Sequence, residues 1–306
     1  MRRRFLLLAC SLLMVSSAIG QQLDMELFEA MKPRNIGPAG MSGRVTAIAA
    51  VIDNPDVIYA GTASGGLWKS TSGGIKWDPI FDDQPTHSIG SIAINQSNPD
   101  VVWVGAGEGN PRNSQSAGNG LYRSLDGGET WTHLGLEESR NIYRIVLDPT
   151  DSNTALIGVQ GPAWGETAQR GVFRTTDGGK TLDRVLFVNE KTGVGDMVMD
   201  PSNPHHILVG MWEFRRWPWF FKSGGPGSGL YETWDGGVTW NQLTDKDGLP
   251  KGELGRIGLA FSTNEPEIVY AMVEAKKNGL YRSENGGKKW KMVNDDANVN
   301  ERPFYY

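Results

Sequence analysis

The segment YRSLDGGETW, at residues 122–131, has four related segments elsewhere in this 306-residue chain. Each copy has an aromatic residue, a polar residue four places later, and two glycines directly after it. The copies recur about every fifty residues, which indicates an internal structural repeat. The polar positions are Ser72, Asp126, Asp177, Asp235 and Asn285.

A second motif precedes each copy. It reads IAINQSNPDVVWVG at residues 92–105 and MVMDPSNPHHILVG at residues 197–210, which are two apolar runs of strand type separated by an Asn-Pro turn. Each unit therefore predicts four strands, with a variable loop after the second and a Gly-Gly turn after the third. Four short antiparallel strands in a unit of this length are typical of a β-propeller blade. We predict an all-β protein, a β-propeller of four-stranded antiparallel blades, with about five blades in this chain.

The repeats also predict the domain organisation. A lead segment is expected at 21–34, and the start of a further, truncated blade at 299–306. The truncated blade favours an incomplete ring and therefore a fragment of a longer protein. The alternative is a five-bladed ring that is closed by residues 21–43. The blades are predicted at about 35–85, 86–138, 139–188, 189–250 and 251–298.

The first twenty residues, MRRRFLLLACSLLMVSSAIG, are typical of a signal peptide. Three arginines precede an apolar run, and Ala18 and Gly20 stand at the cleavage positions. A lipoprotein signal ending at Cys10 is the alternative, although the apolar run before it is short. Because Cys10 is the single cysteine of the chain, the mature protein is expected to have no disulfide. We expect an exported bacterial protein that is periplasmic, at the cell surface or extracellular.

Charge and composition argue against several classes of function. The chain has a formal charge of −5 and no basic stripe, so no nucleic-acid partner is expected. No second apolar run is long enough to span a bilayer. The four histidines include no His-Glu-x-x-His pattern, which argues against a zinc hydrolase. We therefore expect no metal and no cofactor.

The repeated segment resembles the Asp box of sialidases, sortilin-type propellers and xyloglucanase-type glycoside hydrolases. In such a turn the aspartate accepts backbone hydrogen bonds, the glycines allow positive φ, and the tryptophan packs beneath the hairpin. Because Ser72 and Asn285 replace the aspartate in two copies, a structural role is favoured over a catalytic one. The residues assigned to this role are Ser72, Trp77, Asp126, Trp131, Asp177, Asp235, Trp240, Asn285 and Trp290.

Longer stretches at 103–131 and 211–240, with NIGPAGMSGRVTAIA at 35–49, resemble a bacterial family of exported Asp-box (BNR) repeat propellers. Its members have a sortilin-N-terminal-like propeller and are often labelled glycosyl hydrolases. The hydrolase label follows the Asp boxes, which propellers without hydrolase activity share. The Arg-Ile-Pro opening of sialidases is replaced by PRNIGP (33–38). The early aspartate of xyloglucanases is also missing, because GPAGMSGR stands at its place (37–44).

Candidate binding residues are expected on the face opposite to the Gly-Gly turns, which carries the insertions 106–119, 160–171 and 211–228. Glu108 and Glu213 occur at equivalent positions near the end of a second strand and are the candidate catalytic carboxylates. Arginines begin several inner strands, and the segment WEFRRWPWFF adds aromatic rings beside two more. The candidate ligand-binding residues are Arg44, Arg112, Arg144, Arg215, Arg216, Trp217, Trp219 and Arg256.

Each of these features also has a structural interpretation. The glutamates and arginines can pair with each other across adjacent blades. The aromatic segment can pack on the propeller rim or against a later domain.

The main hypothesis is a binding propeller that takes peptide, protein or glycan ligands on its loop face, like the sortilin type. The alternative is a glycoside hydrolase of the sialidase or xyloglucanase kind, in which paired carboxylates cleave the glycosidic bond. If the chain is an enzyme, this is the class we expect. A third hypothesis is a structural module of a surface assembly. The expected partners are a peptide, protein or polysaccharide ligand and the remaining blades or downstream domains of the longer protein.

Overall fold

The computed structural model describes residues 44–299, 301 and 304. The predicted signal peptide, the lead segment at 21–34 and the proposed ring-closing segment at 21–43 lie outside these residues. Within the described part the protein is all-β, as predicted. The helical elements among the described residues are two single turns of 3-10 helix, η3 (Glu137–Ser139) and η4 (Asp245–Asp247).

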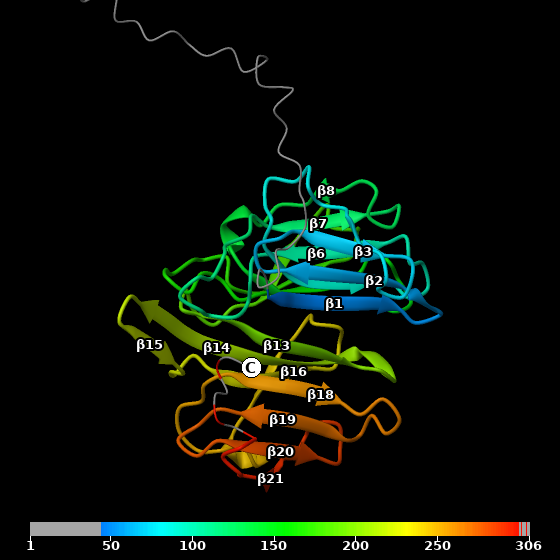
Figure 1. The fold of residues 1–306 in the computed structure, drawn as a ribbon. Helices are drawn as coiled ribbons and strands as arrows, with labels where there is room; N and C mark the ends of the chain where they lie inside the picture. The colour runs from blue at the N-terminus through cyan, green and yellow to red at the C-terminus, as the bar shows by residue number, and fades with distance from the viewer. Residues whose placement is uncertain (1–43, 300, 302–303, 305–306) are drawn as a thin grey trace, which may run out of the picture. The chain divides into compact units, whose positions relative to one another are not determined.

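Five antiparallel sheets, each built around four strands that follow one another in the chain, form five propeller blades (Figure 1). Blade 1 contains β1 (Val45–Val51), β2 (Asn54–Thr62), β3 (Leu67–Ser70) and β4 (Asp78–Pro79). Blade 2 contains β5 (Ile89–Ile94), β6 (Val102–Ala106), β7 (Leu121–Ser124) and β8 (Thr132–His133). Blade 3 contains β9 (Ile142–Leu147), β10 (Ala155–Val159), β11 (Gly171–Thr175) and β12 (Asp183–Leu186). Blade 4 contains β13 (Thr192–Asp200), β14 (Asn203–Trp217), β16 (Gly229–Thr233) and β17 (Asn241–Leu243), with β15 (Phe220–Ser223) added beside β14. Blade 5 contains β18 (Ile257–Phe261), β19 (Val269–Val273), β20 (Gly279–Ser283) and β21 (Lys291–Asn294).

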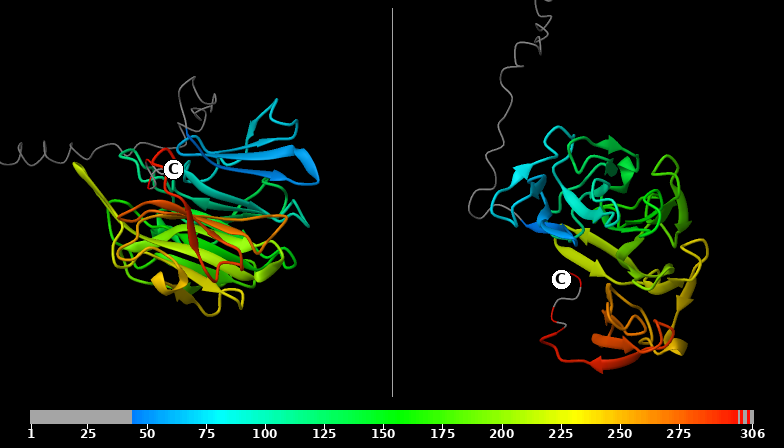
Figure 2. Two further views of the ribbon diagram at one scale, coloured as in Figure 1. Left: turned by 90° about the horizontal axis from the view of Figure 1, so that it is seen from below. Right: turned by 90° about the vertical axis from the view of Figure 1, so that its right-hand side faces the viewer.

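The blades pack face to face in chain order. The first strands of successive blades lie side by side, β1 with β5, β5 with β9, β9 with β13, and β13 with β18; Figure 2 gives two further views of them. The buried apolar side chains form a separate cluster between each pair of adjacent blades. Because a four-stranded sheet is too small to bury both of its faces alone, each blade depends on its neighbours for stability.

The Asp-box turn is held by its own polar side chain. Asp126 accepts hydrogen bonds from Thr130 N (2.9 Å), Thr130 Oγ1 (2.5 Å) and Ser124 Oγ (2.7 Å). These bonds, that of the Thr130 hydroxyl above all, lower the pKa of Asp126 to about 2. Two glycines follow with φ of 68° and 97°, which a side chain would disfavour. At the copies that lack aspartate, Ser72 Oγ and Asn285 Oδ1 each accept a backbone bond of 2.9 Å from the residue four places on.

The tryptophan of the turn joins its blade to the preceding one. Trp131 of blade 2 donates from Nε1 to Ile80 O (2.8 Å), and its ring meets the edge of Phe81 at 5.1 Å. The rings of Trp240 and Trp290 also pack into the clusters around Leu156 and Leu208 of the preceding blades, while Trp240 Nε1 donates to Gly237 O of its own turn (3.2 Å). In blade 1, Trp77 donates to Gly74 O of its own turn (2.8 Å).

Candidate functional site

The aromatic segment at 211–228 forms a β-hairpin rather than the loop that the sequence predicts. β14 runs on to Trp217, and β15 returns antiparallel to it, with Trp217 opposite Phe220. Only Pro218 and Trp219 separate the two strands. Aromatic side chains favour strand conformation, and their alternation along β14 gives one buried and one partly open face.

The open face of this hairpin carries the predicted site residues. Glu213, Arg215 and Trp217 alternate along β14 and all line one cavity. The side chains of Trp212, Phe214 and Arg216, which alternate with them, are buried; Glu213 is buried as well, whereas Arg215 and Trp217 are half-buried.

The buried Arg216 joins the three insertions. Its backbone N donates to Ala163 O (2.8 Å) in the 160–171 segment. Its guanidinium donates to Pro111 O (2.8 Å) and to Asn113 Oδ1 in the 106–119 segment. Segments that are distant in sequence therefore meet on the hairpin, at the face where the sequence predicts binding.

We call the cavity on the open face the Glu213 cavity. It has a volume of about 200 Å³ and is lined by Gly165, Glu166, Lys191, Glu213, Phe214, Arg215, Trp217 and Lys222. Lys222 Nζ lies 3.4 Å from Glu213 Oε1, and Lys191 Nζ lies 4.0 Å from Glu166 Oε1. The third cation, Arg215, stands directly opposite Lys222 on the neighbouring strand and stacks over Trp217. Two carboxylates and three cations therefore face one small space beside an indole ring.

The two carboxylates differ in exposure. The Glu213 side chain is 11% exposed, whereas the Glu166 side chain is 49% exposed. Gly227 N donates to Glu213 Oε2 at 3.0 Å. A Cβ atom at Gly225 would lie 2.5 Å from the Glu213 carboxyl, so a larger residue there would displace it.

Arg170 fixes the shape of the segment that carries Glu166. Its buried guanidinium donates to the carbonyl oxygens of Gln160 (2.6 Å), Pro162 (2.6 Å) and Gly165 (3.0 Å). It also lies 4.8 Å from the centre of the Phe214 ring. Burial, with a smaller contribution from the charge of Arg215, lowers the pKa of Arg170 to about 10.

Glu108 does not line the Glu213 cavity. It is fully buried and makes a bidentate pair with Arg44 of blade 1, with distances of 2.7 Å to Nε and 2.6 Å to Nη2. The carboxylate that accompanies Glu213 in the cavity is instead Glu166.

The other inner-strand arginines also have partners within the propeller. Arg144 Nε donates to Asp196 Oδ1 of the next blade at 2.6 Å. The guanidinium of Arg256 lies over the rings of Tyr143 (4.8 Å) and Trp212 (5.3 Å) and donates to Phe304 O. These contacts agree with the structural interpretation of the arginines.

The remaining predicted residues are at the surface. Arg112 is exposed in the 106–119 segment, and Trp219, at the tip of the hairpin, is 84% exposed. Sequence reasoning missed Glu166, Lys191 and Lys222. Glu166 lies in an insertion that was already assigned to the binding face, and this position was its one available signal.

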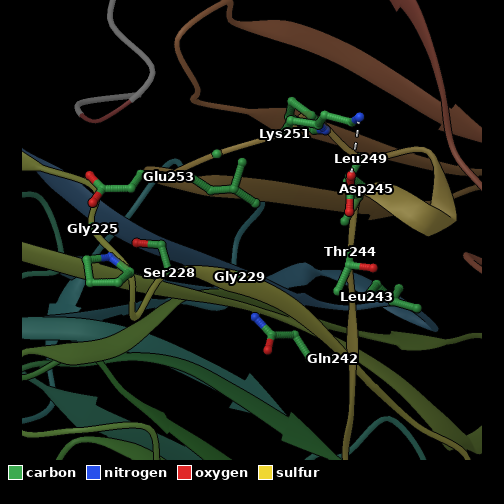
Figure 3. Close-up of a pocket in the computed structure, with 14 residues that line it drawn as sticks. Gly225, Ser228, Gly229, Gln242, Leu243, Thr244, Asp245, Leu249, Lys251 and Glu253 are labelled. Carbon is green, nitrogen blue, oxygen red and sulfur yellow. Dashed lines mark ion pairs between the residues drawn. The ribbon is translucent and has the colours of Figure 1, made fainter.

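A second cavity lies where blade 4 connects to blade 5, and we call it the Leu249 cavity (Figure 3). Its volume is about 480 Å³. Its walls come from the β15–β16 loop, from β17 and from the connection that follows. The lining residues are Gly225, Pro226, Ser228, Gly229, Gln242, Leu243, Thr244, Asp245, Leu249, Pro250, Lys251, Gly252, Glu253 and Leu254.

The residues that the structure describes contain no group of three or more His, Cys, Asp or Glu side chains that could hold a metal ion. They also contain no helix long and apolar enough to cross a membrane.

Comparison with curated proteins finds xyloglucanases. The chain is 27% identical over 269 residues to a xyloglucanase of Paenibacillus sp., covering 78% of this chain and 24% of that protein. It is 30% identical over 183 residues to a xyloglucanase of Hypocrea jecorina, covering 56% and 20%. The match to Xgh74A of Acetivibrio thermocellus is 27% over 287 residues, covering 84% and 31%. The chain thus spans a third or less of the length of these relatives, and no family model matches it.

Comparison with solved structures finds propellers of GH74 enzymes. An ancestral GH74 enzyme aligns with a TM-score of 0.62 at 22% identity, covering 86% of this chain and 32% of that one. The GH74 enzyme of Niastella koreensis gives a TM-score of 0.57 at 22% identity, covering 80% and 38%. At this identity the likeness establishes the fold, and the prediction of a β-propeller is confirmed.

Proposed function

We propose that this chain is part of a glycoside hydrolase propeller that binds a polysaccharide of the xyloglucan type on its insertion face. The curated relatives are xyloglucanases by name, which favours the hydrolase alternative over a sortilin-like peptide binder. A protein that binds such a polysaccharide is expected to act outside the cell, which agrees with the signal peptide that the sequence predicts.

The observation that carries the proposal is the pair of carboxylates in the Glu213 cavity. Most glycosidases place two carboxyl groups on either side of the bond that they cleave. One acts as general acid, and the other acts as base or nucleophile. Glu213 and Glu166 line the same space, and their different exposure gives them different surroundings, as the two roles require.

The remaining lining residues suit a sugar ring. Trp217 offers an indole face on which the C–H groups of a pyranose can stack. Arg215 and Lys222 stand beside it as hydrogen-bond donors, and sugar hydroxyl groups accept such bonds. The proposed bound sugar lies across Trp217 with its glycosidic oxygen toward Glu213.

The test is xyloglucan hydrolysis by the full-length protein and its Glu213→Gln and Glu166→Gln variants. Replacing a general acid or base by an amide is expected to lower the hydrolysis rate by about 100-fold or more, while xyloglucan binding is retained. Glu190→Gln is the matched control, because Glu190 is exposed nearby but does not line the cavity. Hydrolysis by Glu213→Gln at the unaltered rate would falsify the assignment of this carboxylate.

A second candidate is a propeller that binds glycan or peptide without cleaving it. The pairing of Glu108 with Arg44 favours this candidate, because the first of the two predicted catalytic carboxylates is engaged in an ion pair. In that case the protein binds its ligand and releases no reducing sugar, and Trp217→Ala weakens the binding. Arrays of glycans and of peptides, probed with the full-length protein, distinguish the two classes of ligand.

A further inference from the structure

We propose that the Leu249 cavity is a second subsite for the same polysaccharide, and that it takes a neutral sugar unit while the Glu213 cavity holds another. This inference rests on the proposed function and adds to it a second place of contact and the charge class of the sugar. Four observations support it.

The first observation is that the two cavities share a wall. Gly225 and Ser228 line the Leu249 cavity, and the same short loop closes over Glu213. Glu213 N donates to Ser228 Oγ at 2.9 Å, and Gly227 N donates to Glu213 Oε2 at 3.0 Å. The 225–228 loop therefore borders both cavities, because it lines the Leu249 cavity and bonds to a residue that lines the Glu213 cavity.

The second observation is the size of the two cavities. Ligand pockets typically measure about 300–1,000 Å³. The Glu213 cavity, at about 200 Å³, lies below this range, whereas the Leu249 cavity, at about 480 Å³, lies within it. A polysaccharide held only at the Glu213 cavity would bury little of its surface, so a second subsite is needed for useful affinity.

The third observation is the chemistry of the lining. Three leucines with buried side chains, Leu243, Leu249 and Leu254, supply an apolar floor on which the C–H face of a pyranose can lie. The rim carries the exposed Gln242, Glu253, Asp245 and Lys251. Figure 3 shows Lys251 and Asp245 on the side of the cavity across from Gln242; their charged atoms lie 3.8 Å apart.

This rim favours a neutral sugar over an acidic one. Two carboxylates and one ammonium give it a net negative charge, which disfavours a uronate or sulfate group. Carboxylate oxygens accept hydrogen bonds from sugar hydroxyl groups. The side chains of Gln242 and Glu253 make no hydrogen bond with the residues that the structure describes, so their side-chain polar atoms are available to a ligand.

The fourth observation is that the wall is preorganised. The segment before Leu249 contains a capping box in which Thr244 and Asp247 bond each other's backbone. Asp247 is held to blade 5 by Trp290 N, which donates to Asp247 O (2.7 Å), and by Lys289 Nζ at 2.9 Å from Asp247 Oδ1. On the other side, Gly225 N donates to Leu254 O at 3.2 Å. A wall that is already ordered costs little entropy when a ligand binds.

The test is calorimetric binding of xyloglucan oligosaccharides of increasing length to the full-length protein. The variants are Gln242→Ala, Glu253→Gln and the two combined. Both side chains are exposed, so their replacement leaves the fold intact, and the unfolding temperature verifies this. Glu265→Gln, an exposed glutamate on the β18–β19 turn that does not line the cavity, is the matched control.

The combined variant is expected to bind long oligosaccharides about tenfold more weakly, because the hydrogen bond of Gln242 is lost and the amide at position 253 is a weaker acceptor than the carboxylate. The shortest oligosaccharide that still binds to the unaltered protein fills only the Glu213 cavity. The combined variant should therefore bind it with unchanged affinity. Equal affinity of the combined variant for long oligosaccharides overturns the inference while the proposed function stands. The inference is also overturned if the unaltered protein binds peptides or uronate oligosaccharides more strongly than xyloglucan oligosaccharides and these substitutions abolish that binding. If the unaltered protein binds no oligosaccharide of any length, the proposed function itself fails.

Discussion

At the scale of single residues, a buried carboxylate depends on its partner. Glu108 is fully buried and is held by a bidentate contact with Arg44, whose side chain is about one third exposed. Removing one member of a buried pair costs more than the pair contributes, because the charge that remains is left without compensation.

We expect Arg44→Gln to lower the free energy of unfolding by about 2–3 kcal/mol. Urea unfolding at neutral pH measures the change. The double variant Arg44→Gln/Glu108→Gln should recover part of the loss, because the isolated buried charge is then gone. An unchanged urea midpoint in the single variant would contradict this account of the pair.

The Asp-box aspartates predict how stability depends on pH. Hydrogen bonds within the turn lower the pKa of Asp126 and of Asp177 to about 2, and that of Asp235 also lies below its usual value. Because the folded state binds protons less readily than the unfolded chain, the stabilisation is present above about pH 4 and is lost as pH falls toward 2. In a variant with all three replaced by asparagine, the urea midpoint should vary less between pH 4 and pH 2. If the urea midpoint falls equally with pH in the variant and in the unaltered protein, the three aspartates do not contribute to the pH dependence of stability.

At the scale of elements, the β14–β15 hairpin is the part of the site that was hardest to foresee. Its two-residue turn, Pro218-Trp219, lacks the glycine or asparagine that usually signals a hairpin, and the aromatic run therefore reads as a loop. The Asp-box hairpins were readable because Gly-Gly turns fix their backbone locally. The contacts of Arg216 with Pro111 and with Ala163 join distant segments, and no local pattern encodes them.

We expect Arg216→Ala to loosen the hairpin and the 106–119 segment together. Hydrogen exchange of both should become faster, because the donor that bonds Pro111 O and Asn113 is lost. The neighbouring Arg215→Ala is the control, since its side chain faces the Glu213 cavity instead. If exchange in Arg216→Ala becomes faster in the hairpin alone, Arg216 does not couple the two segments.

At the scale of the whole molecule, stability is distributed over the interfaces between blades. Four apolar clusters lie between adjacent blades, and in three of them an Asp-box tryptophan contributes. The fold was predictable because every repeat carries the same turn and strand signals. Residues that a single blade contributes to the proposed binding face, such as Lys191, follow no repeat and were not predictable from the sequence.

Trp240→Ala should weaken the interface between blades 3 and 4 by about 3 kcal/mol, because a large ring is removed from a packed cluster. In a repeat protein the effect stays near the altered interface. Hydrogen exchange should therefore rise in blades 3 and 4 and remain unchanged in blades 1 and 2. Trp164→Ala, at a partly exposed tryptophan, serves as the control, and uniform loosening of all blades would argue against this model.

The tryptophan contacts have a direction, since Trp131, Trp240 and Trp290 each pack against the preceding blade. A chain that leaves the ribosome, or is threaded through a translocon, amino end first brings each new indole ring to a sheet that has already emerged. Each blade can therefore pack onto a preceding blade that has already folded, before the later residues of the chain have emerged. Threading in the opposite direction would leave every ring without its docking surface until the next blade arrived.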